Sequence, residues 1–166
     1  METRRALVTG AASGIGAACA RRLAADGVQV IAVDYDADGL AELAAPGIEP
    51  LRADLSDLDG LSKLPTDVDI LVNNAGVQQI APVEQFPPER FGYILRLMLE
   101  SPFRLIRQTL PYMYGRGWGR VVNISSSTDS GPARSRRRTS LPSTGWRGSA
   151  KWSHSKVRPT GSPVTA

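Results

Sequence analysis

The sequence predicts an α/β protein built on a doubly wound parallel sheet. Two observations support this fold class. Between residues 4 and 126, short apolar runs alternate with segments of helical periodicity, which is typical of parallel strands joined by helices on both faces of a sheet. The first apolar run also ends in a glycine-rich turn that opens directly into a helical segment.

The first half of the chain predicts three strands and two helices. The run ALVTG (6–10) is apolar up to its glycine, and GIGAACARRLAADG (14–27) has helical spacing and ends at a glycine. The run VQVIAVD (28–34) is rich in β-branched residues, as strands are. We expect a short helix at ADGLAELAA (37–45) and a third strand at IEPLRADL (48–55).

The second half completes the alternation. We expect a small helix near SDLDGLSKL (56–64), a strand at DILVNN (69–74) and a long helix over about 88–115. The run GRVVNISS (119–126) is the fifth expected strand. Each parallel pair in such a sheet needs a crossover connection, and the intervening helical segments supply it.

Charge and composition divide the chain at about residue 126. Residues 1–126 contain 12 basic and 15 acidic side chains, whereas residues 127–166 contain eight basic side chains and the single acid Asp129. The formal net charge of +4 therefore comes from the second segment. We interpret 1–126 as an incomplete nucleotide-binding domain and 127–166 as a basic, low-complexity and disordered tail with too little apolar surface to order itself.

Neither a signal peptide nor a long apolar span is found in the sequence. The single cysteine, Cys19, lies in a run of small residues at helical spacing, where simple packing is the favoured interpretation. A lone cysteine excludes an internal disulfide and fits a reducing compartment. We therefore expect a cytoplasmic protein without a membrane partner, and the sequence contains no metal-ligand cluster.

The turn TGAASGIG places Gly10, Gly14 and Gly16 at the start of a helix, beside Ser13 and Ile15. Glycines allow a tight turn and let a phosphate approach bare backbone. The helix N-terminus then offers free N–H groups and the positive end of its dipole. A pyrophosphate is the expected ligand, and no Gly-Lys-Ser/Thr is present to favour a nucleoside-triphosphate loop.

The second strand ends in Asp34, where an acid can accept hydrogen bonds from a ribose diol and repel a 2′-phosphate. The loop residues Ala11, Ala12 and Ser13 and the following Tyr35 include no cation that would attract that phosphate. NAD is therefore the predicted cofactor, in preference to NADP.

Three motifs occur in order: TGxxxGxG at 9–16, NNAG at 73–76 and VVNISS at 121–126. They resemble the motifs of the short-chain dehydrogenase/reductase family. The resemblance covers residues 4–126 and implies a Rossmann-type fold with strand order 3-2-1-4-5. It further implies that Asp54 lies beside the adenine, that Asn74, Ala75 and Gly76 help to hold the cofactor, and that Ser126 binds the substrate oxygen. Asn123 and Ser125 are interpreted as structural.

Within the family, the segments NNAGVQQ, FPPE and LPYMYGRGWGR are most similar to those of the D-3-hydroxybutyrate dehydrogenases. That resemblance implies a small hydroxy acid or ketone as substrate and places Gln78 against its carboxylate, although Gln78 could also be a surface residue. It also implies a homo-oligomer, usually a tetramer, whose contacts this chain largely lacks.

Two departures from the family pattern concern catalysis. Met98 stands where relatives carry an asparagine that anchors a proton-relay water, and a methionine is more often a packing residue. The Tyr-x-x-x-Lys pair, in which the ammonium lowers the pKa of the phenol, is missing. Thr139 and Ser143 stand in its places, and we expect the chain as written to be inactive.

A shifted reading frame explains the tail. Back-translating RRTSLPSTGW (137–146) and reading from one base earlier permits AAYVASKHGV, with tyrosine at the place of Thr139 and lysine at that of Ser143. We therefore expect a frameshift, real or a sequencing error, between about Ser126 and Thr128. The basic run RSRRR was then never selected to bind nucleic acid. The alternative is an unshifted, non-catalytic NAD-binding or basic-tailed interaction protein.

Overall fold

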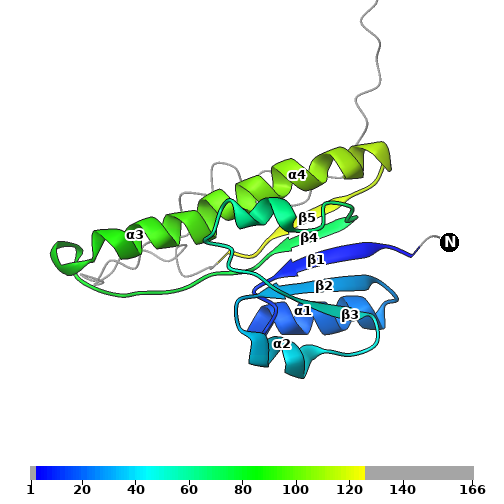
Figure 1. The fold of residues 1–166 in the computed structure, drawn as a ribbon, viewed down its shortest axis with the longest axis horizontal. Coiled ribbons are helices and arrows are strands. Elements are labelled where there is room, and N and C mark those ends of the chain that lie inside the picture. Colours follow the sequence, from blue (N-terminus) through cyan, green and yellow to red (C-terminus); the bar gives the residue numbers. More distant parts are fainter. Residues whose placement is uncertain (1–2, 126–166) are drawn as a thin grey trace, which may run out of the picture.

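Residues 3–125 are described by a computed structural model of the chain. They form a five-stranded, all-parallel sheet in the order β3-β2-β1-β4-β5, as Figure 1 shows. The strands are β1 (Arg5–Thr9), β2 (Gln29–Asp34), β3 (Ile48–Arg52), β4 (Ile70–Asn73) and β5 (Arg120–Asn123). The predicted fold class and strand order are confirmed. The predicted disordered tail, with Ser126, Thr139 and Ser143, lies outside the described residues.

Helices connect the strands in the expected places, and several elements are shorter than expected, most of all the third strand and the small helix that follows it. The helices are α1 (Gly14–Ala25), α2 (Ala37–Leu43), α3 (Pro88–Leu95) and α4 (Ser101–Gly115), with short 3₁₀ turns η1 (Gly60–Lys63) and η2 (Val83–Gln85). The segment predicted as a helix over 56–64 contains only η1, and the strand predicted to reach residue 55 ends at Arg52. Asp54 accepts a hydrogen bond from the backbone N–H of Ser56, and Asp57 accepts one from that of Gly60, so aspartate side chains favour turns in this stretch.

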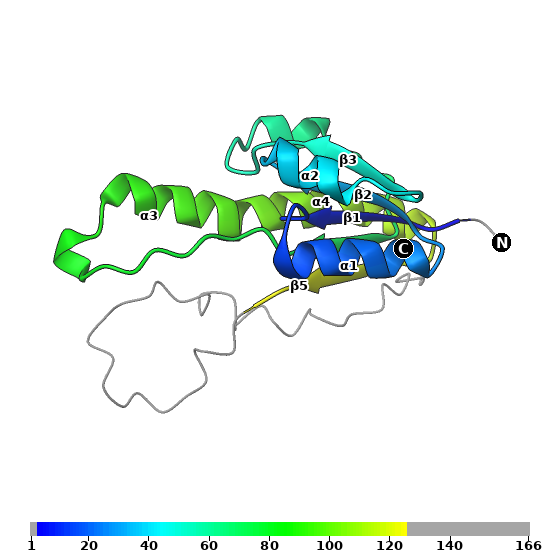
Figure 2. The same ribbon diagram turned by 90° about the horizontal axis from the view of Figure 1, so that it is seen from below.

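The long helix predicted over 88–115 contains a π-helical turn, η3 (Arg96–Glu100), between α3 and α4. Pro102 explains why the α-helical ladder changes there. A proline has no N–H to donate, and its ring clashes with the carbonyl of the residue four positions earlier, which is Met98 inside the turn. Figures 1 and 2 show α3 and α4 as one long rod whose α3 end extends beyond the sheet.

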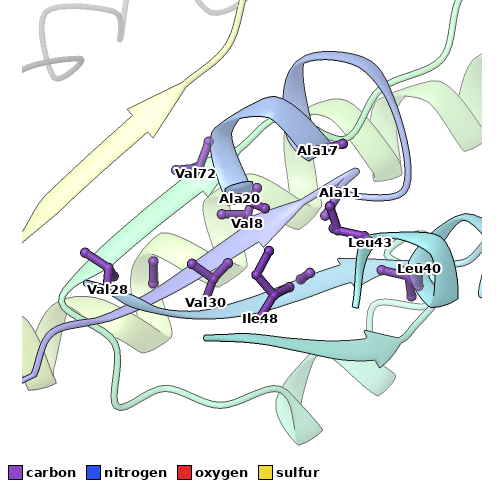
Figure 3. Packing of buried hydrophobic residues seen from close by; sticks show 12 residues of the cluster. Val8, Ala11, Ala17, Ala20, Val28, Val30, Leu40, Leu43, Ile48 and Val72 are labelled. Carbon is purple, nitrogen blue, oxygen red and sulfur yellow. The ribbon is translucent and has the colours of Figure 1, made fainter. Parts of the chain in front are cut away.

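Two hydrophobic clusters cover the two faces of the sheet because successive side chains of a strand point to opposite faces. Ala6 and Val8 of β1 pack with α1 and α2 in one cluster, which Figure 3 shows from close by. Leu7, between them, packs with η1 and α4 in the other. The sheet is therefore buried on both sides, as the continuous apolar runs of the strands predict.

The amino end of the sheet is held by the buried carboxylate of Asp69. The backbone N–H of Arg5 donates to its Oδ2 at 2.9 Å, and the Nε of Arg116 lies 3.5 Å from its Oδ1. Nearby, the guanidinium of Arg4 stacks on Trp118 at 4.0 Å from the ring centroid. These contacts tie β1 to β4 and to the connection between α4 and β5, far from the glycine-rich turn.

Candidate dinucleotide-binding site

The glycine-rich turn joins β1 to α1 at the carboxyl edge of the sheet. Gly10 and Gly14 have positive φ angles of 65° and 53°, a backbone conformation that other residues rarely adopt. A Cβ on Gly10 would lie 2.8 Å from Cα of Ala75, and a Cβ on Gly16 would run into the carbonyl oxygen of Gly10. The turn is therefore packed so closely that only glycine fits at these two places.

The start of α1 is arranged to leave its N–H groups available. Ser13, the N-cap residue, makes no side-chain capping hydrogen bond, and no acidic residue lies in the first turn. Ile15, in the first turn of α1, is 59% exposed, which is common for a single apolar side chain at a protein surface. The free N–H groups suit an anionic ligand placed over the positive end of the helix dipole.

Thr9 and Asn74 hold the turn against the end of β4. The Thr9 hydroxyl accepts hydrogen bonds from the backbone N–H groups of Asn74 at 3.0 Å and Ala75 at 3.2 Å and donates to the carbonyl of Val72 at 3.2 Å. The Asn74 amide donates to the carbonyls of Thr9 at 3.1 Å and Gly10 at 3.0 Å. Asn74 thus stabilises the glycine-rich turn through hydrogen bonds to its backbone carbonyls. The spacing of the motifs does not specify this role.

Asp34 lies at the end of β2 with both carboxylate oxygens engaged. Oδ2 accepts from the backbone N–H of Ala12 at 3.0 Å, and Oδ1 accepts from that of Asp36 at 3.1 Å. The side chain therefore shapes the glycine-rich loop and also lines the pocket beside it. Its predicted contact with a ribose remains a prediction.

An arginine near Asp34 was not foreseen from the sequence. Arg52 on β3 is the register partner of Asp34, and its Nε donates to the carbonyl of Tyr35 at 3.2 Å. The residues directly around Asp34 in sequence contain no cation, but the parallel pairing of β2 with β3 brings this one beside it. Only the strand register, which the sequence does not state, could have shown this neighbour.

A pocket opens between the glycine-rich turn and the α3 side of the molecule. It is lined by eleven residues from six segments: Gly10, Asp34, Tyr35, Ala53, Asp54, Leu55, Ala75, Gly76, Val77, Tyr93 and Leu97. Asp54 is fixed there because its Oδ1 accepts from the N–H of Ser56 at 2.8 Å and from the Ser56 hydroxyl at 2.7 Å. The structure thus gathers four of the predicted groups, Gly10, Asp34, Asp54 and the Ala75–Gly76 pair, around one hollow.

Tyr93 and Leu97 form a wall of this pocket that motif analysis missed. They lie four residues apart, on α3 and η3, and so share one side of the helical rod. The sequence predicts a long helix over about 88–115, but not which segment it would meet.

Two further predicted residues have neighbours that bear on their roles. Met98 lies against the motif loop, because a Cβ on Gly76 would be 3.3 Å from its Cε, and it packs on the hydrophobic cluster of α4. The packing interpretation of Met98 is confirmed. Asn123 accepts a hydrogen bond from the amide of Asn73 at 2.8 Å, which links β5 to β4 and supports a structural role.

Gln78, the predicted substrate contact, is exposed on the loop that follows the NNAG motif. Its neighbour Gln79 accepts a hydrogen bond from the Nε of Arg90 at 2.8 Å. Among residues 3–125, no group of three or more potential metal ligands is found. No helix in this part of the chain is long and apolar enough to cross a membrane.

The doubly wound sheet, the glycine-rich turn and the pocket beside it define a dinucleotide-binding α/β protein. Comparison with known families identifies it further, since residues 4–135 match the short chain dehydrogenase model. The chain belongs to this family, whose members are NAD(P)-dependent oxidoreductases.

Its relatives include two D-beta-hydroxybutyrate dehydrogenases. The protein from Cupriavidus necator is 41% identical over 138 residues, which cover 75% of this chain and 53% of that protein. The one from Rhizobium meliloti is 36% identical over 140 residues, covering 75% and 54%. The chain thus spans about half the length of these curated relatives.

Solved structures support the same family and bear on the cofactor. A putative betaketoacyl-ACP reductase superposes with a TM-score of 0.75 at 33% identity, covering 90% of this chain and 62% of that one. A metagenomic short-chain oxidoreductase in complex with NADP gives 0.73 at 32% identity, covering 78% and 65%. Solved structures of the family thus include one with bound NADP.

Proposed function

We propose that this chain is an NAD-binding short-chain oxidoreductase of the 3-hydroxybutyrate dehydrogenase type, inactive in the form written. The observation that carries the proposal is Asp34, which lines the pocket at the end of β2. A carboxylate there suits the free diol of NAD, and its charge opposes a 2′-phosphate. Arg52, the register partner of Asp34 on β3, is a nearby cation that would attract the 2′-phosphate of NADP and so opposes this preference for NAD.

The residues present fit the cofactor. The glycine-rich turn has no room for a Cβ at Gly10 or Gly16, so backbone N–H groups of Gly14, Ile15 and Gly16 would hold the pyrophosphate. Asp34 would bind the adenosine ribose, Asp54 would lie beside the adenine, and the 74–76 segment would form the floor. When bound, NAD supplies the acceptor for a hydride from the substrate alcohol.

Catalysis in this family also requires a base that takes the alcohol proton. Thr139 and Ser143 stand in the places of the tyrosine and lysine, and neither alcohol side chain is a suitable general base. We propose that residues from about Ser127 onward come from a shifted reading frame. The abrupt change of charge and the family-like sequence permitted one base away support this origin.

Three versions of the chain test the proposal. The chain as written and the variant Thr139→Tyr with Ser143→Lys should produce no NADH from D-3-hydroxybutyrate above background. A chain whose downstream frame is restored by one base should turn over, because the pair acts only when a helix holds it at the nicotinamide. Turnover by the unrepaired chain would refute the assignment.

Sequencing the coding DNA across codons 124–130 separates the two origins. A missing base relative to the family-like frame supports the oxidoreductase origin. An intact frame in independent genomic DNA, together with NAD binding and no turnover, would instead favour the non-catalytic NAD-binding protein.

A further inference from the structure

The loop that carries Gln78 leaves the sheet at the end of β4 and continues to η2. Figures 1 and 2 both show it running alongside α3, so that loop and helix together form an arm extending beyond the strands. The residues of the loop from Ala75 to Pro82 belong to no helix or strand of the sheet. Ile80 forms a β-bridge, and side-chain contacts add to it in holding the loop in place.

The half-buried guanidinium of Arg90, on α3, makes two contacts. Its Nε donates to Oε1 of Gln79 at 2.8 Å, and its Cζ lies 4.7 Å from the centroid of the Tyr93 ring. A planar guanidinium can stack on a ring and donate in its own plane at the same time, which an ammonium cannot do. No carboxylate within residues 3–125 forms an ion pair with Arg90 that would draw it away.

The ring on which Arg90 stacks is also a wall of the dinucleotide pocket, which Tyr93 lines together with Asp34 and Asp54. One guanidinium thus bridges the wall of the pocket and the residue that follows Gln78. A ligand that fills the pocket limits the motion of the Tyr93 ring, and the stacked guanidinium then has fewer orientations. Its hydrogen bond to Gln79 becomes more persistent, and the loop becomes more ordered.

We propose that Arg90 is a positioning residue that couples dinucleotide binding in the pocket to the order of the Gln78 loop. This inference rests on the proposed binding of NAD. Because coupling is reciprocal, a loop that is already ordered should also favour the ligand.

Hydrogen exchange on the full chain, with and without saturating NAD, tests the proposal. Without NAD, Arg90→Ala should speed exchange of the amides at 77–80 by about ten-fold, which corresponds to the loss of one charge-assisted hydrogen bond. With NAD, the wild-type loop should gain protection, and Arg90→Ala should gain none. Arg90→Lys should behave like Arg90→Ala because it loses the stacked, in-plane geometry.

Two further variants separate positioning from general stability. Gln79→Glu gives the guanidinium a charged acceptor and should protect the loop more than wild type does, and this gain should disappear when Arg90→Ala is added. Arg96→Ala, at an exposed arginine on the same helical rod, should leave loop exchange unchanged. Circular dichroism of each variant checks that the fold persists.

The outcomes distinguish the coupling from the proposed function. If calorimetry shows no NAD binding to the wild-type chain, the proposed function fails and the coupling falls with it, while the experiment without NAD still tests the Arg90 contact. If NAD binds but leaves loop exchange unchanged, or if Arg90→Ala keeps the protection, the coupling is refuted and the function stands.

Discussion

At the scale of single residues, the site depends on polar side chains that are already hydrogen-bonded to the backbone when no ligand is present. Thr9 is 2% exposed, and its hydroxyl oxygen is the acceptor for two backbone N–H groups at the start of the NNAG loop. Asp34 likewise accepts from two backbone N–H groups. Side-chain oxygens that fix the shape of the pocket, such as those of Asp34, are therefore also the polar groups that line it.

Thr9→Val tests this dependence because it keeps the shape of the side chain and removes its oxygen. Two N–H groups at the NNAG loop then lose their partner, and the free energy of unfolding should fall by about 2–4 kcal/mol. Denaturant titration measures the loss, and Thr9→Ser, which retains the hydroxyl, should recover most of it. Equal stability of the valine and serine variants would contradict the role assigned to the hydroxyl.

Asp34→Ala should weaken NAD binding by about 1–3 kcal/mol, since charge-assisted hydrogen bonds to the ribose are lost. Asp34→Asn keeps an acceptor for Ala12 and removes the charge, so it should lose less affinity for NAD and gain relative affinity for NADP. Calorimetry with both cofactors measures the change, and Glu42→Ala on the exposed side of α2 is the control. Equal or tighter binding of NADP by the unmutated chain would overturn the choice of NAD.

At the scale of elements, the approach of α1 to the sheet is set by two glycines. Gly16 faces the carbonyl of Gly10 and the amide of Asn74, with no space for a methyl group. The N-terminus of α1 can therefore lie over the turn only when residues 10 and 16 both lack a Cβ. Further along the same side, a Cβ on Gly39 of α2 would lie 2.8 Å from the Cβ of Ala12, so α2 is held close to the loop as well.

Gly16→Ala should displace the start of α1, abolish measurable NAD binding and lower stability by about 2–4 kcal/mol through overpacking and strain. Gly115→Ala is the matched control, because a Cβ there meets nothing within 4 Å. Thermal unfolding and calorimetry on both variants give the comparison. Retained NAD affinity in the Gly16 variant would show that the turn does not carry the ligand.

At the scale of the whole molecule, the described part leaves apolar surface open on the outer side of the helical rod. Phe91, Leu95, Leu99 and Phe103 are spaced four residues apart, and Phe103 is 57% exposed. Val122 and Ile124 are also exposed at β5, which pairs with β4 on one side only within residues 3–125. Open apolar surface and an unpaired strand edge favour association.

We therefore expect the chain as written to self-associate at micromolar concentrations. Leu99→Lys combined with Phe103→Glu should shift it toward the monomer, because burying these charges in a contact is costly. Analytical ultracentrifugation measures the distribution, and Glu42→Lys, at an exposed residue of α2 on the other face of the sheet, is a control away from the apolar row. A wild-type chain that stays monomeric throughout would contradict the expectation.

The sequence was sufficient for what depends on local pattern and failed where partners come from distant segments. Alternating apolar runs predicted the sheet, and the glycine spacing predicted the turn and the start of α1. The contact of Arg90 with Gln79 and the pairing of Asp34 with Arg52 arise only when separate segments meet in space. The π turn was missed because apolar residues keep nearly helical spacing through it, and Pro102 was the single local sign.

The π turn η3 determines which way the side chains of the following helix, α4, point around its axis. Residues four apart on an α-helix drift by about 40° around its axis, so a row of such residues would wind away from one side. A π turn takes up an extra residue and turns the row back, which keeps Phe91 and Phe103 on a common side. Deleting one residue there would rotate α4 by about 100° and swing the buried Leu105 and Met113 out of the core. The length of this segment is therefore as constrained as its composition.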